Sequence, residues 1–357
     1  MGRINPPPQL EPVPVPAKTV AQRMIDAAIC AYAIGPDTYD PIPFFRDAIE
    51  WQEGPKVIRR GEGKIDAGLV GVMKDGWAVL SLRGTLSSFN GILSFIDFFE
   101  DWRQDDETLQ VPFNPPGSDG FGCVHQGFHE AVTEMWPDIE TYLSGCDWPK
   151  LKGLRITGHS KGAGMAFLCA VLAHFHLASL QQGGPQRIEV HAFAAPLAGN
   201  AEFHCQYEAA GLHKVTIRHQ RESDLVPFLP AYDKFDVLDK WPFERENPTL
   251  DLVRVILKRT HRHYALAGEI AFYIDQSADK KWHAPIKGAE GQGDAERAIL
   301  YAIYNEQNDR IAAAHSAINS YWPSIFERDL PSGVTEELAT VVLKNAEAYA
   351  KAALAGD

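Results

Sequence analysis

The 357-residue chain could form one large domain or two ordinary ones, and its 45% hydrophobic and 23% charged residues describe a globular protein. Its net charge of −13 argues against a nucleic-acid partner and against adsorption to anionic membranes. No apolar run reaches the roughly 18 residues that span a bilayer, so we predict no transmembrane segment.

Cysteine usage and the N-terminus bear on the compartment. The five cysteines are scattered and none belongs to a C-x-x-C pair, which favours free thiols and a reducing compartment. The N-terminus has no apolar signal core. We therefore predict a cytoplasmic protein, or a secreted one if a leader peptide has been removed.

The first part of the chain predicts an extended arm, a helix and a β-hairpin. Residues 1–17 contain six prolines and should be extended. Residues 19–34 place small apolar side chains at helical spacing and end at a Gly-Pro pair. Two apolar runs, 69–73 and 77–82, are joined by Lys-Asp-Gly, which is a strong hairpin signal.

The middle of the chain alternates predicted strands and helices. The strands are expected at 154–157, 188–194 and 214–219, and the helices at 163–172 and 201–210. This alternation is typical of βαβ units and of a largely parallel sheet. A further β run is expected at 252–257 and a helix at 264–274. Three alanine-rich helices are predicted near the C-terminus, at 294–304, 311–321 and 336–354.

A strand–turn–helix unit with a serine at its turn lies at the centre of this alternation. Residues 158–162 read Gly-His-Ser-Lys-Gly, which is the G-x-S-x-G pattern in the context that it requires. The glycines lack Cβ atoms, so a strand and a helix can approach closely around a strained serine. The helix N-terminus favours developing negative charge. We predict that Ser160 is a nucleophile; the alternative is a plain turn before a buried helix.

A serine nucleophile needs a base, and the base needs an orienting acid. In α/β-hydrolases these follow in the order Ser, Asp or Glu, His. Asp224 follows the strand at 214–219 and is the candidate acid, although it could simply cap a turn. His261 and His263 both follow the β run at 252–257, and spacing alone does not choose between them.

The oxyanion hole needs two hydrogen-bond donors. One is the backbone N–H of Lys161, the residue after the nucleophile. The other should come from a loop after an earlier strand, and Arg83-Gly84-Thr85 follows the strand at 77–82.

Five short motifs, in order along the chain, resemble those of the class 3 lipases, which include the triacylglycerol lipases of filamentous fungi. They are Arg83-Gly-Thr85, Val124-His-Gln-Gly-Phe128, Gly158-His-Ser-Lys-Gly162, Phe193-Ala-Ala-Pro-Leu-Ala-Gly-Asn200 and Asp224-Leu-Val-Pro227. Each motif alone is weak, but the five in this order are specific. The resemblance covers residues 60–275 and leaves the arm and the C-terminal helices outside.

The resemblance implies roles for individual residues. Ser160 would be the nucleophile and Asp224 the acid, with Thr85 and Lys161 as oxyanion donors. The family histidine often lies five residues before a glycine, a spacing that His263 has with Gly268 and His261 does not.

The resemblance also implies an amphipathic lid after the oxyanion strand. Residues 89–102 have that position and pattern. The apolar face that would cover the site consists of Phe89, Ile92, Phe95, Ile96 and Phe99. Such a lid opens at a lipid surface or on substrate binding; the alternative is that this stripe is plain core.

Two features of this sequence differ from the pattern of the fungal members of the family. Lys161 stands where fungal members usually have an apolar residue, which adds a charge at the mouth of the site but leaves the backbone donor intact. The fungal enzymes are secreted and disulfide-bonded, and this sequence predicts neither. Their preference for triglycerides therefore does not follow for this chain.

These patterns together predict an α/β protein with the α/β-hydrolase fold, a mostly parallel central sheet and a helical lid. We expect an arm at 1–17, a catalytic domain at 18–290 and a C-terminal helical extension at 291–357. No cofactor is expected, and no metal either, because the histidine pairs His125/His129 and His174/His176 lack a clear third ligand.

The predicted function is carboxylic ester hydrolysis by a lipase or esterase on acylglycerols, with transient contact to a lipid interface. The alternatives are a phospholipase A1, a short-chain esterase, or a non-catalytic lipid-binding or scaffold protein on the same fold. The sequence does not determine the oligomeric state.

Overall fold

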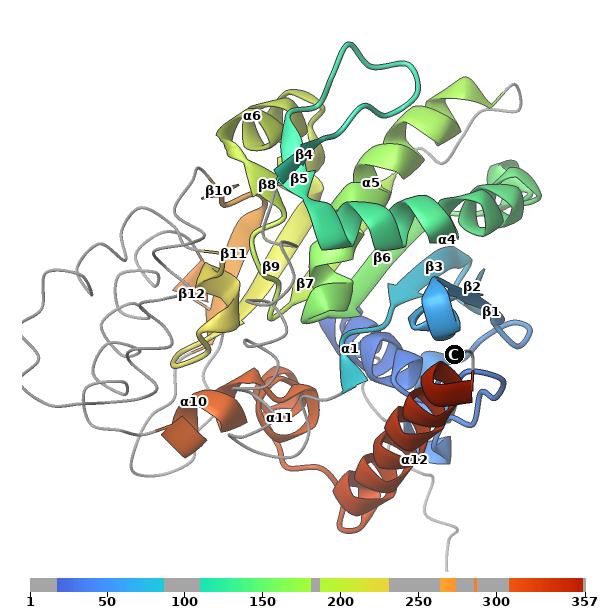
Figure 1. Cartoon of the computed structure of the whole chain (residues 1–357), viewed down its shortest axis with the longest axis vertical. Helices are drawn as coiled ribbons and strands as arrows, with labels where there is room; N and C mark the ends of the chain where they lie inside the picture. The colour runs from blue at the N-terminus through green and yellow to red at the C-terminus, as the bar shows by residue number, and fades with distance from the viewer. Residues whose placement is uncertain are drawn as a thin grey trace, which may run out of the picture.

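A computed structural model describes residues 18–86, 110–180, 187–230, 264–273, 286–287 and 308–355. These residues form a central sheet with helices packed on both of its faces (Figure 1). The predicted arm, the predicted lid with its five apolar residues, and both His261 and His263 lie outside the described residues.

The central sheet has eight strands in the order β1-β2-β3-β6-β7-β9-β11-β12. Their bounds are Lys56–Arg60, Asp66–Val72, Trp77–Leu82, Gly153–His159, Ile188–Phe193, Thr216–Arg221, Glu269–Tyr273 and Ile286–Lys287. The five strands from β3 to β11 pair in parallel, and the outer pairs β1–β2, β2–β3 and β11–β12 are antiparallel. The mostly parallel sheet that the sequence predicted is confirmed.

The predicted hairpin is the β2–β3 pair. Its turn residue Gly76 has a φ of +86°, a backbone conformation that glycine adopts without strain. Within the turn, the Asp75 carboxylate accepts a hydrogen bond from the backbone N–H of Trp77 at 3.2 Å. The Asp-Gly signal therefore reflects local turn chemistry that the tertiary structure keeps.

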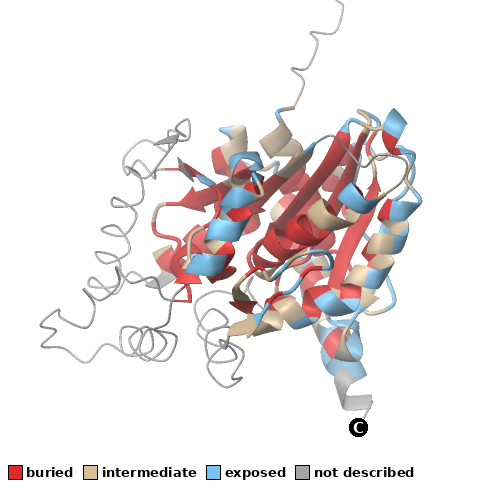
Figure 2. Ribbon diagram, turned by 90° about the horizontal axis from the view of Figure 1, so that it is seen from above, coloured by how far each residue is buried: buried red, intermediate tan, exposed pale blue. Residues whose placement is uncertain are grey.

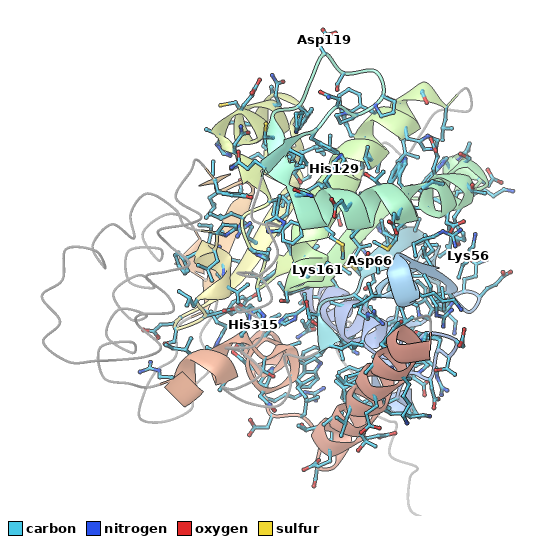
Figure 3. The ribbon with its side chains drawn as sticks, in the orientation of Figure 1. Lys56, Asp66, Asp119, His129, Lys161 and His315 are labelled. Carbon is cyan, nitrogen blue, oxygen red and sulfur yellow. The ribbon has the colours of Figure 1, made fainter. Side chains whose placement is uncertain are left out.

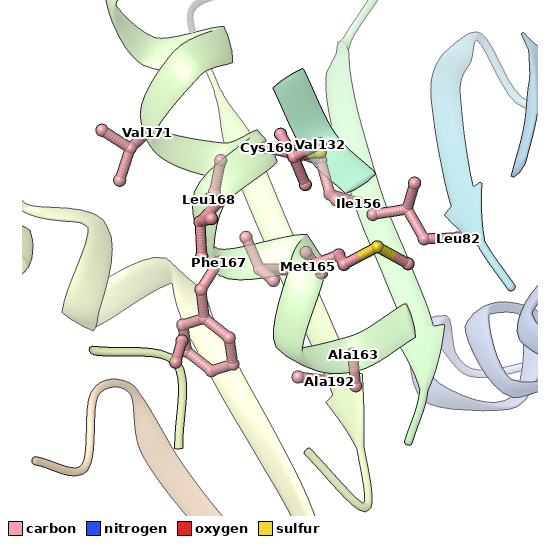
Figure 4. Close-up of a cluster of buried hydrophobic side chains, with 14 of the residues drawn as sticks. Leu82, Val132, Ile156, Ala163, Met165, Phe167, Leu168, Cys169, Val171 and Ala192 are labelled. Carbon is pink, nitrogen blue, oxygen red and sulfur yellow. The ribbon is translucent and has the colours of Figure 1, made fainter. Parts of the chain in front are cut away.

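One face of the sheet is covered by α4 (Gln126–Ser144) and α5 (Lys161–Ser179). Their apolar side chains, among them Met165 and Val132, pack on Leu82 and Ile156 of the sheet (Figure 4). In the described part of the chain, α5 is the one helix long and apolar enough to cross a membrane, but most of it is buried in this core. The apolar character of α5 on all sides follows from that burial.

The other face is covered by α1 (Val20–Ala31), α2 (Pro43–Ile49), α11 (Trp322–Phe326) and α12 (Val334–Ala355). Helix α1 begins at a capping box in which Thr19 and Gln22 each bond the other's backbone N–H. Burial is densest along the strands (Figure 2). Tyr321 and Trp322, near the C-terminus, are also buried. The C-terminal helices thus share a core with the N-terminal ones.

A smaller, four-stranded sheet lies at one end of the described structure, in the order β10-β8-β5-β4. Its strands are Tyr264–Ala265, Gly199–Asn200, Cys123–His125 and Gln110–Pro112. Helix α6 (Ala201–Ala209) starts directly from β8, with the Asn200 side chain accepting from the backbone of Phe203 at 2.9 Å.

The predicted helix at 264–274 is wrong, since this segment forms β10 and β11. Gly268 interrupts it with a φ of +91°, and a Cβ there would meet the Thr216 side chain of the neighbouring strand. The residues that follow, Glu269–Tyr273, extend the parallel sheet by pairing with β9. Pairing with an open sheet edge thus outweighs the helical spacing of the apolar residues.

The predicted helix at 311–321 is broken in two. Helix α10 (Asn308–His315) ends at His315, and a π-helical turn, η8 (Ala317–Tyr321), follows. Ser316 lies between them in an extended conformation, and its hydroxyl accepts from the backbone N–H of Asn319 at 3.1 Å. A serine that caps a new turn therefore divides what composition suggested was one helix.

Candidate active site

Ser160 occupies a sharp turn between β6 and α5. Its φ of 57° and ψ of −128° are strained for a residue with a side chain, at a cost of about 1–3 kcal/mol. The flanking glycines make the turn sterically feasible. A Cβ on Gly158 would overlap the backbone of Gly162, and one on Gly162 would overlap the carbonyl of Leu82 at the end of β3. The predicted strand–turn–helix unit is present.

Three side chains form a hydrogen-bonded chain at this turn. The Ser160 hydroxyl lies 2.9 Å from Nε2 of His315. On the other side of the ring, Nδ1 of His315 lies 3.1 Å and 3.2 Å from the two carboxylate oxygens of Asp224. All three residues are buried, with exposed fractions of 2% or less. Nucleophile, imidazole and carboxylate thus lie in the order that base-assisted serine chemistry requires.

Asp224 accepts two further hydrogen bonds. The backbone N–H of Val226 donates to Oδ1 at 3.0 Å, and the Tyr321 hydroxyl donates to Oδ2 at 2.6 Å. Burial and the nearby charge of Asp224 raise the pKa of Tyr321 well above its usual range, so its hydroxyl keeps its proton. The backbone N–H of Arg221 donates to that hydroxyl at 3.1 Å, which fixes its direction.

The histidine beside Ser160 is His315, which no motif in the sequence indicated. The predicted base, His263, lies outside the described residues, and the position between Ser160 and Asp224 is taken by His315. In the described structure the imidazole between Ser160 and Asp224 is therefore that of His315, and His263 as the base stays a prediction. The only signal in the sequence was chain order, because His315 also follows Asp224, by 91 residues.

His315 comes from the segment that was predicted to be a separate extension. His315 and Tyr321 both lie beyond residue 290, yet they bond to Ser160 and Asp224. A boundary at 290 therefore passes through the site. The long stretch between β9 and α10 carried no spacing rule that could point to His315.

The predicted oxyanion elements lie close to the turn. Lys161 is the first residue of α5, where backbone N–H groups have no acceptor within the helix. Gly84 packs so closely on the turn that a Cβ there would overlap the Tyr32 hydroxyl and lie 2.6 Å from the carbonyl oxygen of His159. The Arg83-Gly84-Thr85 segment therefore runs beside the Ser160 turn, which is the position that an oxyanion loop would need.

The side chain of Lys161 is paired rather than free. Its ammonium lies 2.9 Å from the carboxylate of Asp66 on β2, and Figure 3 shows the two residues side by side. The charge that the sequence predicted at the mouth of the site is thus largely compensated by a neighbouring strand.

Part of the chain matches a known protein family. Residues 79–234 match the family model of the class 3 lipases. Over these residues the chain is similar to the class 3 lipases. The family match supports an ester hydrolase of the lipase type, and it includes the G-x-S-x-G turn and Asp224 but ends before His315. A search of curated proteins gave no match.

Solved lipase structures resemble the fold. The M37 lipase superposes with a TM-score of 0.50 at 16% identity, covering 87% of this chain and 98% of that one. Lipase II from Rhizopus niveus gives 0.47 at 17% identity, covering 71% of this chain and 78% of that one. The Rhizomucor miehei triacylglyceride lipase gives 0.46 at 20% identity, covering 71% and 77%. The predicted α/β-hydrolase fold is confirmed.

Proposed function

We propose that this protein is a serine hydrolase that cleaves carboxylic esters of acyl lipids. The observation that carries the proposal is the hydrogen-bonded chain Ser160–His315–Asp224 on a strained strand–helix turn. The class 3 lipase match over residues 79–234 supports the same reaction class.

In the proposed first half-reaction, His315 Nε2 takes the proton of Ser160 as the hydroxyl oxygen attacks the ester carbonyl. The carbonyl oxygen becomes negative, and the backbone N–H groups of Lys161 and Thr85 stabilise it. The C–O bond to the alcohol then breaks, and the His315 imidazolium returns its proton to the leaving alcohol. This leaves an acyl group on Ser160.

In the second half-reaction, water takes the place of the alcohol. His315 removes a proton from the water as its oxygen attacks the acyl carbonyl, and the tetrahedral intermediate collapses to release the carboxylic acid. The proton on His315 returns to the Ser160 oxygen. No step requires a co-reactant other than water.

Asp224 keeps the imidazole in the reactive tautomer. The carboxylate accepts from Nδ1 of His315, so Nε2 is left without a proton and can accept one from Ser160. The donors from Val226 and Tyr321 hold the carboxylate in place. When the imidazolium forms, the Asp224 charge stabilises it without taking its proton.

We propose acylglycerols as the substrate class because of the family match. A phospholipase A1 or a short-chain esterase would use the same three residues and differs only in substrate profile. A non-catalytic lipid-binding protein would have no need of a nucleophile, base and acid at hydrogen-bonding distances.

The test is hydrolysis of p-nitrophenyl esters from acetate to palmitate, together with emulsified triacylglycerol and phospholipid vesicles. We expect Ser160→Ala and His315→Ala to lower kcat by about 10⁴-fold or more, since such residues act as a unit. His263→Ala is the matched control and should retain activity. Loss of activity in His263→Ala with retention in His315→Ala would return the base to His263. If wild type turned over none of these substrates, the proposed function would be refuted.

A further inference from the structure

His159, the residue before the nucleophile, contacts the main chain of the base. Its Nε2 lies 2.8 Å from the backbone oxygen of His315, and its Nδ1 lies 2.8 Å from the hydroxyl of Tyr32, the residue directly after α1. The two histidine rings have centroids 5.0 Å apart, and the ring of Tyr321 meets His159 edge-on at 5.7 Å. His159 is buried, with an exposed fraction of 1%.

These contacts fix the tautomer and charge of His159. A carbonyl oxygen only accepts, so the proton must be on Nε2, and Nδ1 must accept from the Tyr32 hydroxyl. Burial, followed by the charge of His315, lowers the pKa of His159 well below its usual range. The ring therefore stays neutral and remains a single, directed donor toward His315.

The backbone oxygen of His315 lies at the end of a helix, where its hydrogen-bond donor must come from outside that helix. It belongs to the last residue of α10, and the final carbonyls of a helix have no N–H partner within that helix. The chain then turns through the extended Ser316 into η8. The hydrogen bond from His159 therefore fixes this end of α10 from outside the helix.

We propose that His159 is a positioning residue that fixes the backbone of His315, so that the imidazole stays between Ser160 and Asp224. It does not take part in proton transfer, because its two nitrogens are occupied by Tyr32 and by the carbonyl. This inference rests on the proposed function, in which His315 is the base.

The kinetic test compares three full-length variants. His159→Leu removes the donor, whereas His159→Gln places an amide N–H near the position of Nε2. His191→Gln is the matched control, since His191 is also buried, lies on the adjacent strand β7, and bonds to His219 rather than to the triad. Active sites are counted with a fluorophosphonate, so that kcat refers to folded, reactive enzyme.

We expect His159→Leu to lower kcat per titrated site by about 10- to 100-fold with little change in KM, because displacements near 1 Å have effects of this size. His159→Gln should recover most of the loss, and His191→Gln should match wild type. A merely structural role would lower thermal stability and the number of titratable sites, but not kcat per site. Full kcat per site in His159→Leu would overturn the proposal.

A second readout does not depend on turnover. In ¹⁵N-histidine-labelled protein, the Nδ1 proton of His315 that is shared with Asp224 should give a downfield proton resonance. We expect this resonance in wild type, His159→Gln and Ser160→Ala, and its broadening or loss in His159→Leu. An unchanged resonance in His159→Leu would refute the positioning role even if no ester is found to be a substrate. Loss of the resonance with no ester turnover would leave positioning supported and the proposed function refuted.

Discussion

At the scale of single residues, the Tyr321 hydroxyl links the Asp224 carboxylate to the end of strand β9. It donates to Asp224 at 2.6 Å and accepts from the backbone N–H of Arg221 at 3.1 Å. Hydrogen bonds to a charged group contribute about 1.5–3 kcal/mol, more than neutral ones. The phenol therefore both orients the Asp224 carboxylate and satisfies a buried backbone donor.

Tyr321→Phe should keep the ring packing and lose both hydrogen bonds. We expect stability to fall by about 1–3 kcal/mol, because the Arg221 N–H is left without this partner. We also expect kcat to fall by about tenfold, because the Asp224 carboxylate is held less firmly. Urea denaturation and ester kinetics measure the two effects. Tyr207→Phe is the control: its hydroxyl bonds to Thr216, so it should lose stability but keep kcat. Equal kinetics in the two variants would argue against a role for Tyr321 in the site.

At the scale of elements, α1 and α11 are joined by one buried carboxylate. Asp26 on α1 is fully buried; its Oδ1 accepts from the indole N–H of Trp322 at 2.8 Å, and its Oδ2 from the Lys18 ammonium at 2.8 Å. Burial raises the pKa of Asp26 to about 6, while the charge of Lys18 acts in the opposite direction. Desolvation therefore raises the pKa of Asp26 by more than Lys18 and Trp322 lower it.

The raised pKa of Asp26 predicts a pH-dependent stability. Because the folded-state pKa lies above the 3.8 of an unperturbed Asp, the folded state binds this proton more tightly than the unfolded state. The stabilisation is complete below about pH 4 and is lost as the pH rises through about 6. Relative to Asp26→Asn, wild type should lose about 3 kcal/mol of unfolding free energy between pH 4 and 7.

Urea denaturation of both proteins from pH 4 to 8 measures this difference. Asp119→Asn removes a negative charge from an exposed position and controls for the change in net charge. The prediction would be contradicted if the unfolding free energies of wild type and Asp26→Asn changed in parallel with pH across the whole range.

At the scale of the whole molecule, elements from the N-terminal and the C-terminal parts of the chain share one hydrophobic core. Apolar residues of η8, α11 and α12 pack with α1 and α2 on one face of the sheet. Helix α12 also contacts Arg83, the residue after β3: the Tyr349 hydroxyl accepts from Arg83 at 2.8 Å, and the Arg83 guanidinium lies 4.6 Å from the Tyr349 ring centre. Arg83 further donates to the backbone oxygens of Ile34 and Ile65.

Two truncations should therefore behave differently. A chain ending at 307 lacks His315 and Tyr321, and we expect no ester hydrolysis from it. A chain ending at 332 keeps both residues and lacks α12, which buries Leu338 and Val342 at about 1.5–3 kcal/mol per side chain. We expect it to melt at a lower temperature than the full chain but to keep kcat per titrated site. Hydrolysis by the chain ending at 307 would show that the base lies elsewhere.

The sequence by itself determined the features that depend on local chemistry. The Asp-Gly turn set the hairpin, and the alternation of apolar strands and helices set the parallel sheet. The glycines around Ser160 indicated the turn, because a Cβ on Gly158 would overlap the backbone of Gly162, only four residues further along the chain. Asp224 followed from its place directly after a sheet strand.

Only the tertiary structure decided which histidine meets Ser160. His315 lies 155 residues after Ser160, and packing of the C-terminal helices on α1 brings it there. Tertiary context also turned residues 269–273 into a strand, because β9 offered an unpaired edge, and divided the helix at Ser316. Contacts at such separations depend on how apolar faces pack, and local spacing along a sequence does not encode that packing.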